Sequence, residues 1–470
     1  MTTIATQEKG FKNPFDNIAD PFLQKTGLPF ASVLDAHTIQ QTFQKEDALF
    51  AKEDLFSTPI ILWAFLAQTL RDGKGAACAA AVADIAAYMV QIGQQPPSGD
   101  TGDYCRARAK LNLTALQCLV RQSDQELETQ ADLSWLWKGR HCKLVDGFTF
   151  TMPDTQANQD MYPQLTTQEP GVGFPIARVC AIMSLATACI CDVAIGPFEG
   201  KETGETALLR QILDSFNEGD VAVFDRYYCS YMMIALLKHR GVDVCVRLHQ
   251  ARHSDFRCGR RLGSDDHLVT WYRPQRPQWM SLEEYAQIPE NIDLRETRYQ
   301  VTEPGKETEI ITVVTTLTDP AEYSKEDIAE LYGLRWNVEL DIRQIKQTLN
   351  LDHVRCKSPE MVLRELWVTL LAYNLIRKLT AAAASVHGKQ PRRLGFTLAC
   401  QTVLASWMLL STGSCRNPKA MYTILLKYVA DNEVANRPGR MEPRVLKRRR
   451  HRYPLMTRPR HELQTELVKT

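Results

Sequence analysis

Residues 332–346 have the sequence Tyr-Gly-Leu-Arg-Trp-Asn-Val-Glu-Leu-Asp-Ile-Arg-Gln-Ile-Lys, and their spacing is the most informative feature of the chain. At about 100° per residue, a helix would place Tyr332, Arg335, Glu339 and Lys346 within an arc of about 60°. Apolar residues form a second stripe beside this arc: Leu331, Leu334, Val338, Ile342, Ile345 and Leu349. The stretch predicts a helix that packs on a core along one side and presents a carboxylate between cations along the other.

The distances between these charges favour a phosphate-handling surface. A rise of about 1.5 Å per residue would put Arg335 about 6 Å and Lys346 about 10 Å from Glu339 along the axis, too far for one ligand shell. Several successive phosphates fit better. Charged residues on an amphipathic helix are usually only a solvated face, so the interpretation depends on the complete spacing Tyr-x2-Arg-x3-Glu-x6-Lys.

Two aspartates upstream follow short apolar runs of the kind that form buried strands. Asp146 follows residues 142–145 and precedes Gly147, which permits a close backbone approach, and Asp225 follows residues 221–224. Such aspartates commonly cap turns. Phosphodiester cleavage and joining, however, need carboxylates from separate elements that converge on two divalent ions.

The spacing Tyr-x2-Arg-x3-Glu-x6-Lys resembles the signature of DDE transposases of insertion sequences, specifically insertion-sequence family four. Asp-Arg-x-Tyr at residues 225–228 resembles the middle aspartate of that family. The match at Asp146 is looser, because Phe148 stands where family members often carry a small hydroxyl residue. Asp154, in the family-like Met-Pro-Asp-Thr at residues 152–155, is the alternative to Asp146.

The resemblance implies that Asp146, Asp225 and Glu339 are the catalytic, metal-binding residues of a DNA transposase. It implies two Mg²⁺ ions per site, with Mn²⁺ as a possible substitute. Tyr332 and Arg335 would steady the terminal phosphates, and Lys346 would hold the backbone beyond. Water would free a 3′-OH, which would then attack a second phosphodiester; whether a hairpin intermediate forms stays open.

The resemblance also implies the partners: double-stranded DNA, as terminal inverted repeats and target, and a homodimer in the synaptic complex. Arg226 has two equally good interpretations, a structural ion pair and a DNA contact. Trp271 and Trp279 are both candidates for stacking on a flipped base, although a tryptophan in a small β-domain more often belongs to a core.

Changes in hydrophobic pattern along the chain predict three parts, and the middle one is expected to be a ribonuclease-H-like α/β core. Residues 1–138 are expected to form a helical domain, in which Arg106, Arg108 and Lys110 lie close together on one helix; the resemblance implies that this domain binds DNA. Residues 139–385 are expected to form the mixed-sheet core, and the resemblance implies that an antiparallel β insertion interrupts it at about residues 250–309. Residues 386–470 are expected to form a C-terminal helical region and a basic DNA-binding tail.

The tail is the main local excess of charge in a chain whose net charge is only +1. Residues 437–460 contain ten basic residues, including Arg444, Lys447, Arg448 and Arg449, against the single acid Glu442. Such a run is often only solvated, but it would also bind phosphates by releasing counterions. The string resembles the end of many members of the same family, which favours DNA binding.

Composition excludes several other classes of protein. A chain of 470 residues with 44% hydrophobic and 24% charged content has an ordinary globular composition for two or three domains. It has no run of eighteen apolar residues and no apolar signal core in residues 1–13, so we expect no membrane partner and a cytoplasmic protein. The family resemblance implies a bacterial protein associated with the nucleoid. No Gly-rich phosphate loop of the Gly-x4-Gly-Lys-Ser/Thr type occurs, so we expect no nucleotide cofactor.

Two alternatives belong to other functional classes. One is a catalytically silent DNA-binding protein derived from a transposase. The other is a ribonuclease-H-like, metal-dependent nuclease that cuts DNA but never joins it.

Overall fold

The computed structural model describes residues 36–45, 49, 55–302, 308–411, 416–434, 456 and 458–469. By its internal contacts the chain forms two compact units, residues 1–130 with 371–434, and residues 131–370 with 435–470. The C-terminal helices up to residue 434 therefore pack with the N-terminal helices. None of the helices in these ranges is both long and apolar enough to cross a bilayer.

The first unit is helical, as the sequence predicts. It contains α2 (Ala36–Lys45), α3 (Thr58–Thr69), η1 (Gly73–Ala76), α4 (Cys78–Gln91), α5 (Gly102–Ala109), α6 (Leu113–Thr129), the later part of α13 (Pro359–His387), η6 (Pro391–Arg393), α14 (Phe396–Ser411) and α15 (Pro418–Asp431). Asn374 of α13 donates to the hydroxyl of Ser123 on α6 at 3.0 Å. Lys378, one turn further, pairs with Glu126 at 2.7 Å. Polar contacts between buried faces thus fix α13 against α6.

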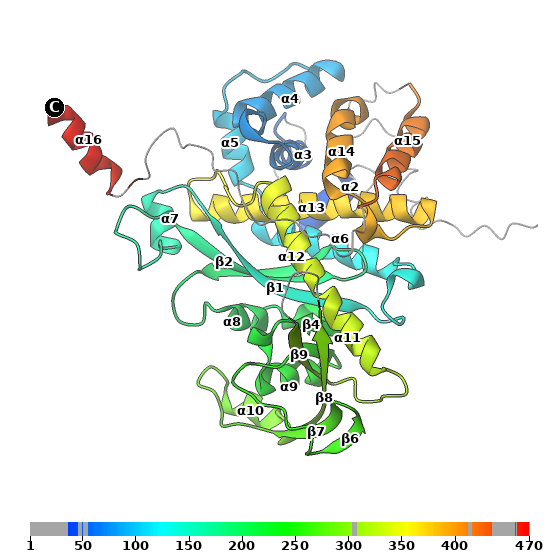
Figure 1. Ribbon diagram of the computed structural model, residues 1–470. Coiled ribbons are helices and arrows are strands. Elements are labelled where there is room, and N and C mark those ends of the chain that lie inside the picture. The colour runs from blue at the N-terminus through cyan, green and yellow to red at the C-terminus, as the bar shows by residue number, and fades with distance from the viewer. Residues whose placement is uncertain are drawn as a thin grey trace, which may run out of the picture. The chain divides into compact units, whose positions relative to one another are not determined.

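The second unit is built on one nine-stranded mixed sheet with helices against it (Figure 1). Its strands are β1 (Cys142–Thr151), β2 (Ile176–Ser184), β3 (Ile190–Pro197), β4 (Val221–Phe224), β5 (Asp243–Arg247), β6 (Arg260–Gly263), β7 (Asp266–Tyr272), β8 (Asn291–Val301) and β9 (Glu309–Thr315). Their order is β3-β2-β1-β4-β5-β9-β8-β7-β6. β1, β4 and β5 pair in parallel, and the other neighbours are antiparallel.

The β insertion extends the core sheet. β8 pairs along β9, β7 pairs along β8, and β9 itself pairs with β5 through Cys245 and Thr315. Residues 309–315 thus return to the core sheet as β9. The backbone groups at the edge of β9 would otherwise be unpaired. Strand β8 of the insertion pairs with them and so covers this edge of the core sheet.

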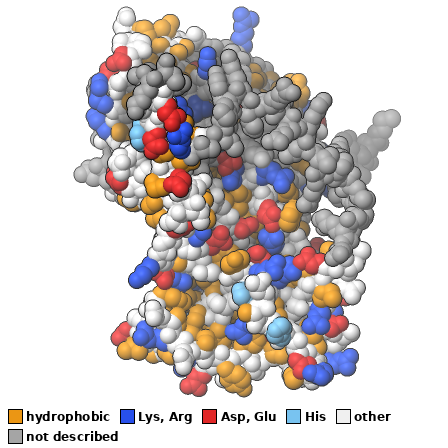
Figure 2. Space-filling model, turned by 60° about the vertical axis from the view of Figure 1, so that its left-hand side comes forward, with side chains coloured by type: hydrophobic (Ala, Val, Ile, Leu, Met, Phe, Trp, Pro, Cys, Tyr) orange, Lys and Arg blue, Asp and Glu red, His pale blue; other side chains and the backbone are white. Residues whose placement is uncertain are grey.

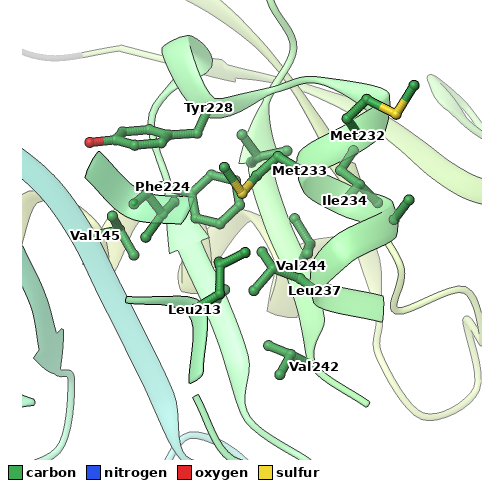
Figure 3. Packing of buried hydrophobic residues seen from close by; sticks show 14 of the residues in the cluster. Val145, Leu213, Phe224, Tyr228, Met232, Met233, Ile234, Leu237, Val242 and Val244 are labelled. Carbon is green, nitrogen blue, oxygen red and sulfur yellow. The ribbon is translucent and has the colours of Figure 1, made fainter. Parts of the chain in front are cut away.

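The remaining helices of this unit are η2 (Leu133–Trp135), α7 (Gln156–Met161), α8 (Glu205–Arg210), η3 (Leu213–Ser215), η4 (Arg226–Tyr228), α9 (Tyr231–His239), α10 (Leu282–Gln287), α11 (Lys325–Leu334), α12 (Trp336–Arg343), the π-helical turn η5 (Gln344–Thr348) and α16 (Arg460–Lys469). Figure 3 shows part of the hydrophobic cluster in which α9 packs on the parallel strands, with Phe224 of β4 beside Val145 of β1. Tyr228 closes this cluster, and its hydroxyl points away from Met233 and Ile234. The cluster thus holds the strand ends that carry Asp146 and Asp225.

The stretch at residues 331–349 is helical, but in three pieces. α11 ends at Leu334, α12 begins at Trp336, and Arg335 between them keeps a helical backbone with φ −51° and ψ −36°. Figure 1 shows α11 and α12 following one another across the sheet. The predicted apolar stripe is largely buried: Leu331, Val338, Ile342, Ile345 and Leu349. This burial explains why the segment stays in register with the core despite the break.

A buried ion pair joins β7 and β8 in the extended part of the sheet. Arg295 binds Asp266 through two hydrogen bonds of 2.8 and 2.6 Å and donates a third, of 2.6 Å, to the carbonyl of Tyr323. Both side chains are almost fully buried. A buried pair of this kind adds little over an apolar pair, but breaking it leaves one charge uncompensated.

We expect Asp266→Asn to lower the free energy of unfolding by about 3–5 kcal/mol, because it leaves Arg295 buried without its carboxylate. Urea unfolding followed by fluorescence measures the change. Asp265→Asn is the matched control: Asp265 is half-exposed and lies 3.8 Å from Arg298, so its loss should cost less than about 1 kcal/mol. Equal midpoints for the two variants would contradict the assignment.

Candidate active site

Asp146 lies in the middle of β1, at the level where its neighbour β4 has just ended. β1 extends past the apolar run that ends at residue 145 and continues to Thr151, because β2 pairs with it from Lys143 to Thr151. The parallel pairing with β4 covers only Cys142 to Val145, which lie opposite Val221 to Phe224. Beyond that level β4 no longer pairs with β1, and Asp146 is the first residue there.

Asp225 follows Phe224 directly, so the parallel register brings the two aspartates to neighbouring positions. Its Oδ1 atom accepts a 2.6 Å hydrogen bond from the backbone N–H of Arg226 and caps the short helix η4. Asp146 does the same with the N–H of Gly147 at 2.8 Å. Each aspartate is therefore oriented by the turn or strand residue that follows it.

Glu339 is connected to Asp146 through Arg335. Arg335 Nη2 lies 2.8 Å from Glu339 Oε1, and its Nη1 lies 3.9 Å from Asp146 Oδ2. The guanidinium is 14% exposed, so water screens this bridge only weakly. The tertiary structure thus brings the residue predicted on the helix to the residue predicted on the first strand.

Tyr332 lies on the same side, largely buried at 6% exposure. Burial raises the pKa of its phenol, and the negative charge of Asp225 raises it further. Tyr332 therefore lies close to the second aspartate. Its part in DNA binding stays a prediction.

Lys346 lies on the π-helical turn η5, which the sequence did not predict. In a π-turn the backbone bond reaches one residue further than in an α-helix, so the stripe drawn at about 100° per residue does not hold there. Lys346 Nζ pairs with Asp352 at 2.9 Å. The segment around Asp352 is held against β1, because the hydroxyl of Thr151 donates to the carbonyl of Asp352 at 3.1 Å.

The electrostatics of Asp146 are those of a crowded acidic site. Burial raises its pKa to about 6, and the charges of Glu205 and Glu339 add to the rise. The N–H of Gly147 and the cation Arg335 act in the opposite direction. Figure 2 shows acidic and basic side chains interspersed on the face it displays. A partly buried carboxylate with this pKa, beside other carboxylates, is typical of functional sites.

Carboxylate oxygens are the ligands that Mg²⁺ prefers, so the donor set suits that ion. As placed, however, no three His, Cys, Asp or Glu side chains within the described ranges lie close enough to hold a metal. Arg335 stands between Asp146 and Glu339 and supplies the positive charge that a cation would otherwise supply. A bound cation would therefore compete with Arg335 for the carboxylates.

Sequence reasoning missed Glu205, the first residue of α8. A Cβ atom on Gly147 would lie only 2.3 Å from Glu205 Cδ, so Glu205 is the group that makes the close approach expected at this glycine. Asp154, the alternative to Asp146, is exposed and accepts a hydrogen bond from Gln159 at 2.8 Å. The geometry thus favours Asp146.

The other predicted contact residues lie away from these carboxylates in sequence. Arg106 of α5 is exposed and pairs with Asp103 at 2.6 Å, and Lys110 is exposed at the end of that helix. Arg108 instead stacks over the rings of Phe65 and Tyr104 and donates to Gln68, which is a packing role within the helical unit. Arg444, Lys447, Arg448 and Arg449 lie outside the described residues.

The two tryptophans of the insertion differ in their surroundings. Trp271 is 7% exposed, donates to Glu296 at 3.0 Å and is covered by Arg252, so it belongs to the core of the sheet extension. Trp279 is 36% exposed and lies under the guanidinium of Arg210, 3.9 Å from the ring centroid. Trp279 is the better placed of the two for an outside ligand.

Comparisons with known proteins agree with the sequence resemblance. The family model "Transposase DDE domain" matches residues 137–375, just over half of the chain. The chain is 27% identical over 326 residues to "Transposase InsG for insertion sequence element IS4" from Escherichia coli K12, covering 68% of this chain and 70% of that protein. It is 44% identical over 55 residues to "Putative transposase InsL for insertion sequence element IS186A" from the same organism, which covers 12% of this chain and 15% of InsL.

Among solved structures, the chain is similar to the piggyBac transposase synaptic complex with hairpin DNA, with a TM-score of 0.42 and 9% identity over 90% of this chain and 86% of that one. The family model and the similarity to InsG together decide the classification. The protein belongs to the DDE-domain transposases, in insertion-sequence family four.

Proposed function

We propose that this transposase binds the ends of an insertion sequence, cleaves them, and joins the freed 3′-OH to target DNA. One observation carries the proposal: the parallel pairing of β1 and β4 ends directly before Asp146 and Asp225, and Arg335 connects Asp146 to Glu339. The proposed acids thus come from three separate elements. Transposase membership supplies the reaction class, and this arrangement supports the choice of residues.

The strand order supports a ribonuclease-H-like core. β1, β2 and β3 form an antiparallel meander, and β4 and β5 follow on the other side of β1 in parallel. In parallel portions of α/β sheets, ligands bind beyond the carboxyl ends of the strands. Asp225 directly follows the carboxyl end of β4, and Asp146 lies at the same level on β1. The functional division into residues 1–138, 139–385 and 386–470 remains part of the proposal.

Asp146, Asp225 and Glu339 would hold two divalent cations, Mg²⁺ or Mn²⁺. When bound, such ions stabilise the attacking and leaving oxygens of an in-line displacement at phosphorus. With the cations bound, Arg335 would be released from Glu339. Its guanidinium N–H groups, which now contact carboxylates, would then bind a phosphate. Lys346 and Tyr332 would position the DNA backbone alongside.

The proposal assigns DNA end binding to the N-terminal helices and non-specific DNA binding to the basic tail. Arg106 and Lys110 are the exposed cations of α5 that would meet phosphates, whereas Arg108 holds the helix in place. The affinity of the basic tail for DNA would fall as the salt concentration rises, because this affinity comes from counterion release. A homodimer on paired ends completes the proposed assembly.

We expect Glu339→Gln to reduce metal-dependent cleavage of an insertion-sequence end at least about 100-fold, since even groups that support metal ligands contribute 10–100-fold. DNA binding, measured by fluorescence anisotropy, should change little. Glu330→Gln, on the exposed side of α11, is the matched control and should keep full cleavage. Undiminished cleavage by Glu339→Gln would refute the role of Glu339, and an inactive wild type would favour the silent DNA-binding alternative.

Joining separates a transposase from a nuclease of the same fold. We expect wild-type protein to join a pre-cleaved end with a free 3′-OH to a supercoiled plasmid in Mg²⁺, because strand transfer uses the same three carboxylates as cleavage. Gel analysis of the labelled end measures the product. Cleavage without any joined product, across Mg²⁺ and Mn²⁺ concentrations, would identify a nuclease.

The raised pKa of Asp146 predicts a stability penalty in metal-free protein. The folded carboxyl keeps its proton up to about pH 6, against an ordinary value of 3.8, so stability falls as pH rises through this interval. The difference corresponds to about 3 kcal/mol at neutral pH. In EDTA at pH 7.5, Asp146→Asn should therefore be more stable than wild type in urea unfolding, with the gain disappearing below about pH 4.

Asp154→Asn is the control for that experiment, because Asp154 is exposed and outside the acidic site. It should unfold like wild type at every pH. A destabilised Asp146→Asn at pH 7.5 would contradict the burial and crowding described for this carboxyl.

A further inference from the structure

Glu205 approaches the acidic site from α8, on the side of β1 opposite to α12. Alternate residues of a strand face opposite sides of the sheet. Val145 packs in the cluster with α8 and α9, so Asp146 points to the α12 side, in agreement with its contact to Arg335. Gly147 then returns to the α8 side, where the Glu205 side chain fills the space a side chain would need.

Gly147 is required by space and not by backbone conformation. It is not among the glycines with positive φ, so any residue could adopt its backbone angles. A Cβ there would lie 2.3–2.6 Å from three atoms of the Glu205 side chain, including carboxylate Oε1. The glycine after Asp146 therefore allows this carboxylate to lie directly against the strand.

A hydrogen bond ties Glu205 to the second aspartate as well. Glu205 Oε2 accepts from the hydroxyl of Tyr228 at 3.3 Å, and Tyr228 ends the short helix that Asp225 caps. The same hydroxyl lies 3.6 Å from Cys180, the residue opposite Gly147 on β2. Glu205 is thus held between the turn after Asp225 and the strand segment after Asp146.

No cation compensates Glu205 within the part of the chain that the structure describes. It makes no ion pair there, and its side chain accepts the one hydrogen bond from Tyr228. Its charge acts on Asp146 more strongly than that of Glu339 does, although Glu339 shares Arg335 with Asp146.

We propose that Glu205 is a fourth carboxylate of the metal site, and that it holds one divalent cation together with Asp146, directly or through bound water. The open edge of β1 beyond Phe224 is where the two carboxylates, one from each side of the strand, can reach a common ion. This inference deepens the proposed function and rests on it. Glu205 would tune cation affinity, while Asp225 and Glu339 complete the site.

The test measures Mn²⁺ binding to the full chain without DNA, by electron paramagnetic resonance of the free ion. Glu205→Gln keeps the acceptor for Tyr228 but removes the charge, and it should bind Mn²⁺ about 10–100-fold more weakly than wild type. Glu205→Asp should recover part of the loss. Glu202→Gln, an equal charge change on an exposed residue paired with Arg210, should bind like wild type.

The outcomes separate the inference from the proposed function. Wild-type protein that binds no Mn²⁺ up to millimolar concentration would overturn both. Loss of binding in Asp225→Asn but wild-type binding in Glu205→Gln would overturn only the role of Glu205. Urea unfolding in EDTA excludes a purely structural role: Glu205→Gln should be at least as stable as wild type, and a clear loss of stability would reject a metal-site carboxylate.

Discussion

Parallel pairing of β1 with β4 is the constraint on which the rest of the site depends. In a parallel pair the strands run in the same direction, so residues that follow each strand emerge at one edge of the sheet. The pairing stops at Val145 and Phe224, and the next residue on each side is an aspartate. Asp146 and Asp225 thus emerge at neighbouring positions on one edge of the sheet.

Arg335 supplies positive charge beside two of the acids. A single guanidinium contacts Glu339 and lies near Asp146, so the helix that carries Glu339 also carries the compensating charge. This fixed positive charge lowers the cost of holding the two carboxylates close together. Under the proposed function, a divalent cation would compete with Arg335 for the same oxygens.

Buried apolar side chains and a buried ion pair in the neighbouring elements stabilise this arrangement. The apolar stripe of α11, α12 and η5 is buried, and the cluster of α8 and α9 packs on the other side of the parallel strands. The insertion adds β8, β7 and β6 to the edge beyond β9 and fixes them with the buried Arg295–Asp266 pair. The proposed site therefore lies on a sheet with packed elements on both sides, which suits a site that needs preorganised charges.

The sequence by itself predicted many of the helices and strands, because periodicity and turn chemistry are local, and it proposed three acids for the site. The stripe at residues 331–349, the apolar runs before Asp146 and Asp225, and the helical N-terminal part can all be recognised from neighbours a few residues apart. Three other features could not be recognised in this way: the π-helical turn at Lys346, the packing role of Arg108 and the burial of Trp271. Each depends on side chains distant in the chain. Only the tertiary structure decided that Glu205 lies against Gly147 and that Arg335 joins Asp146 to Glu339, because sheet register and helix placement, not spacing along the chain, set those distances.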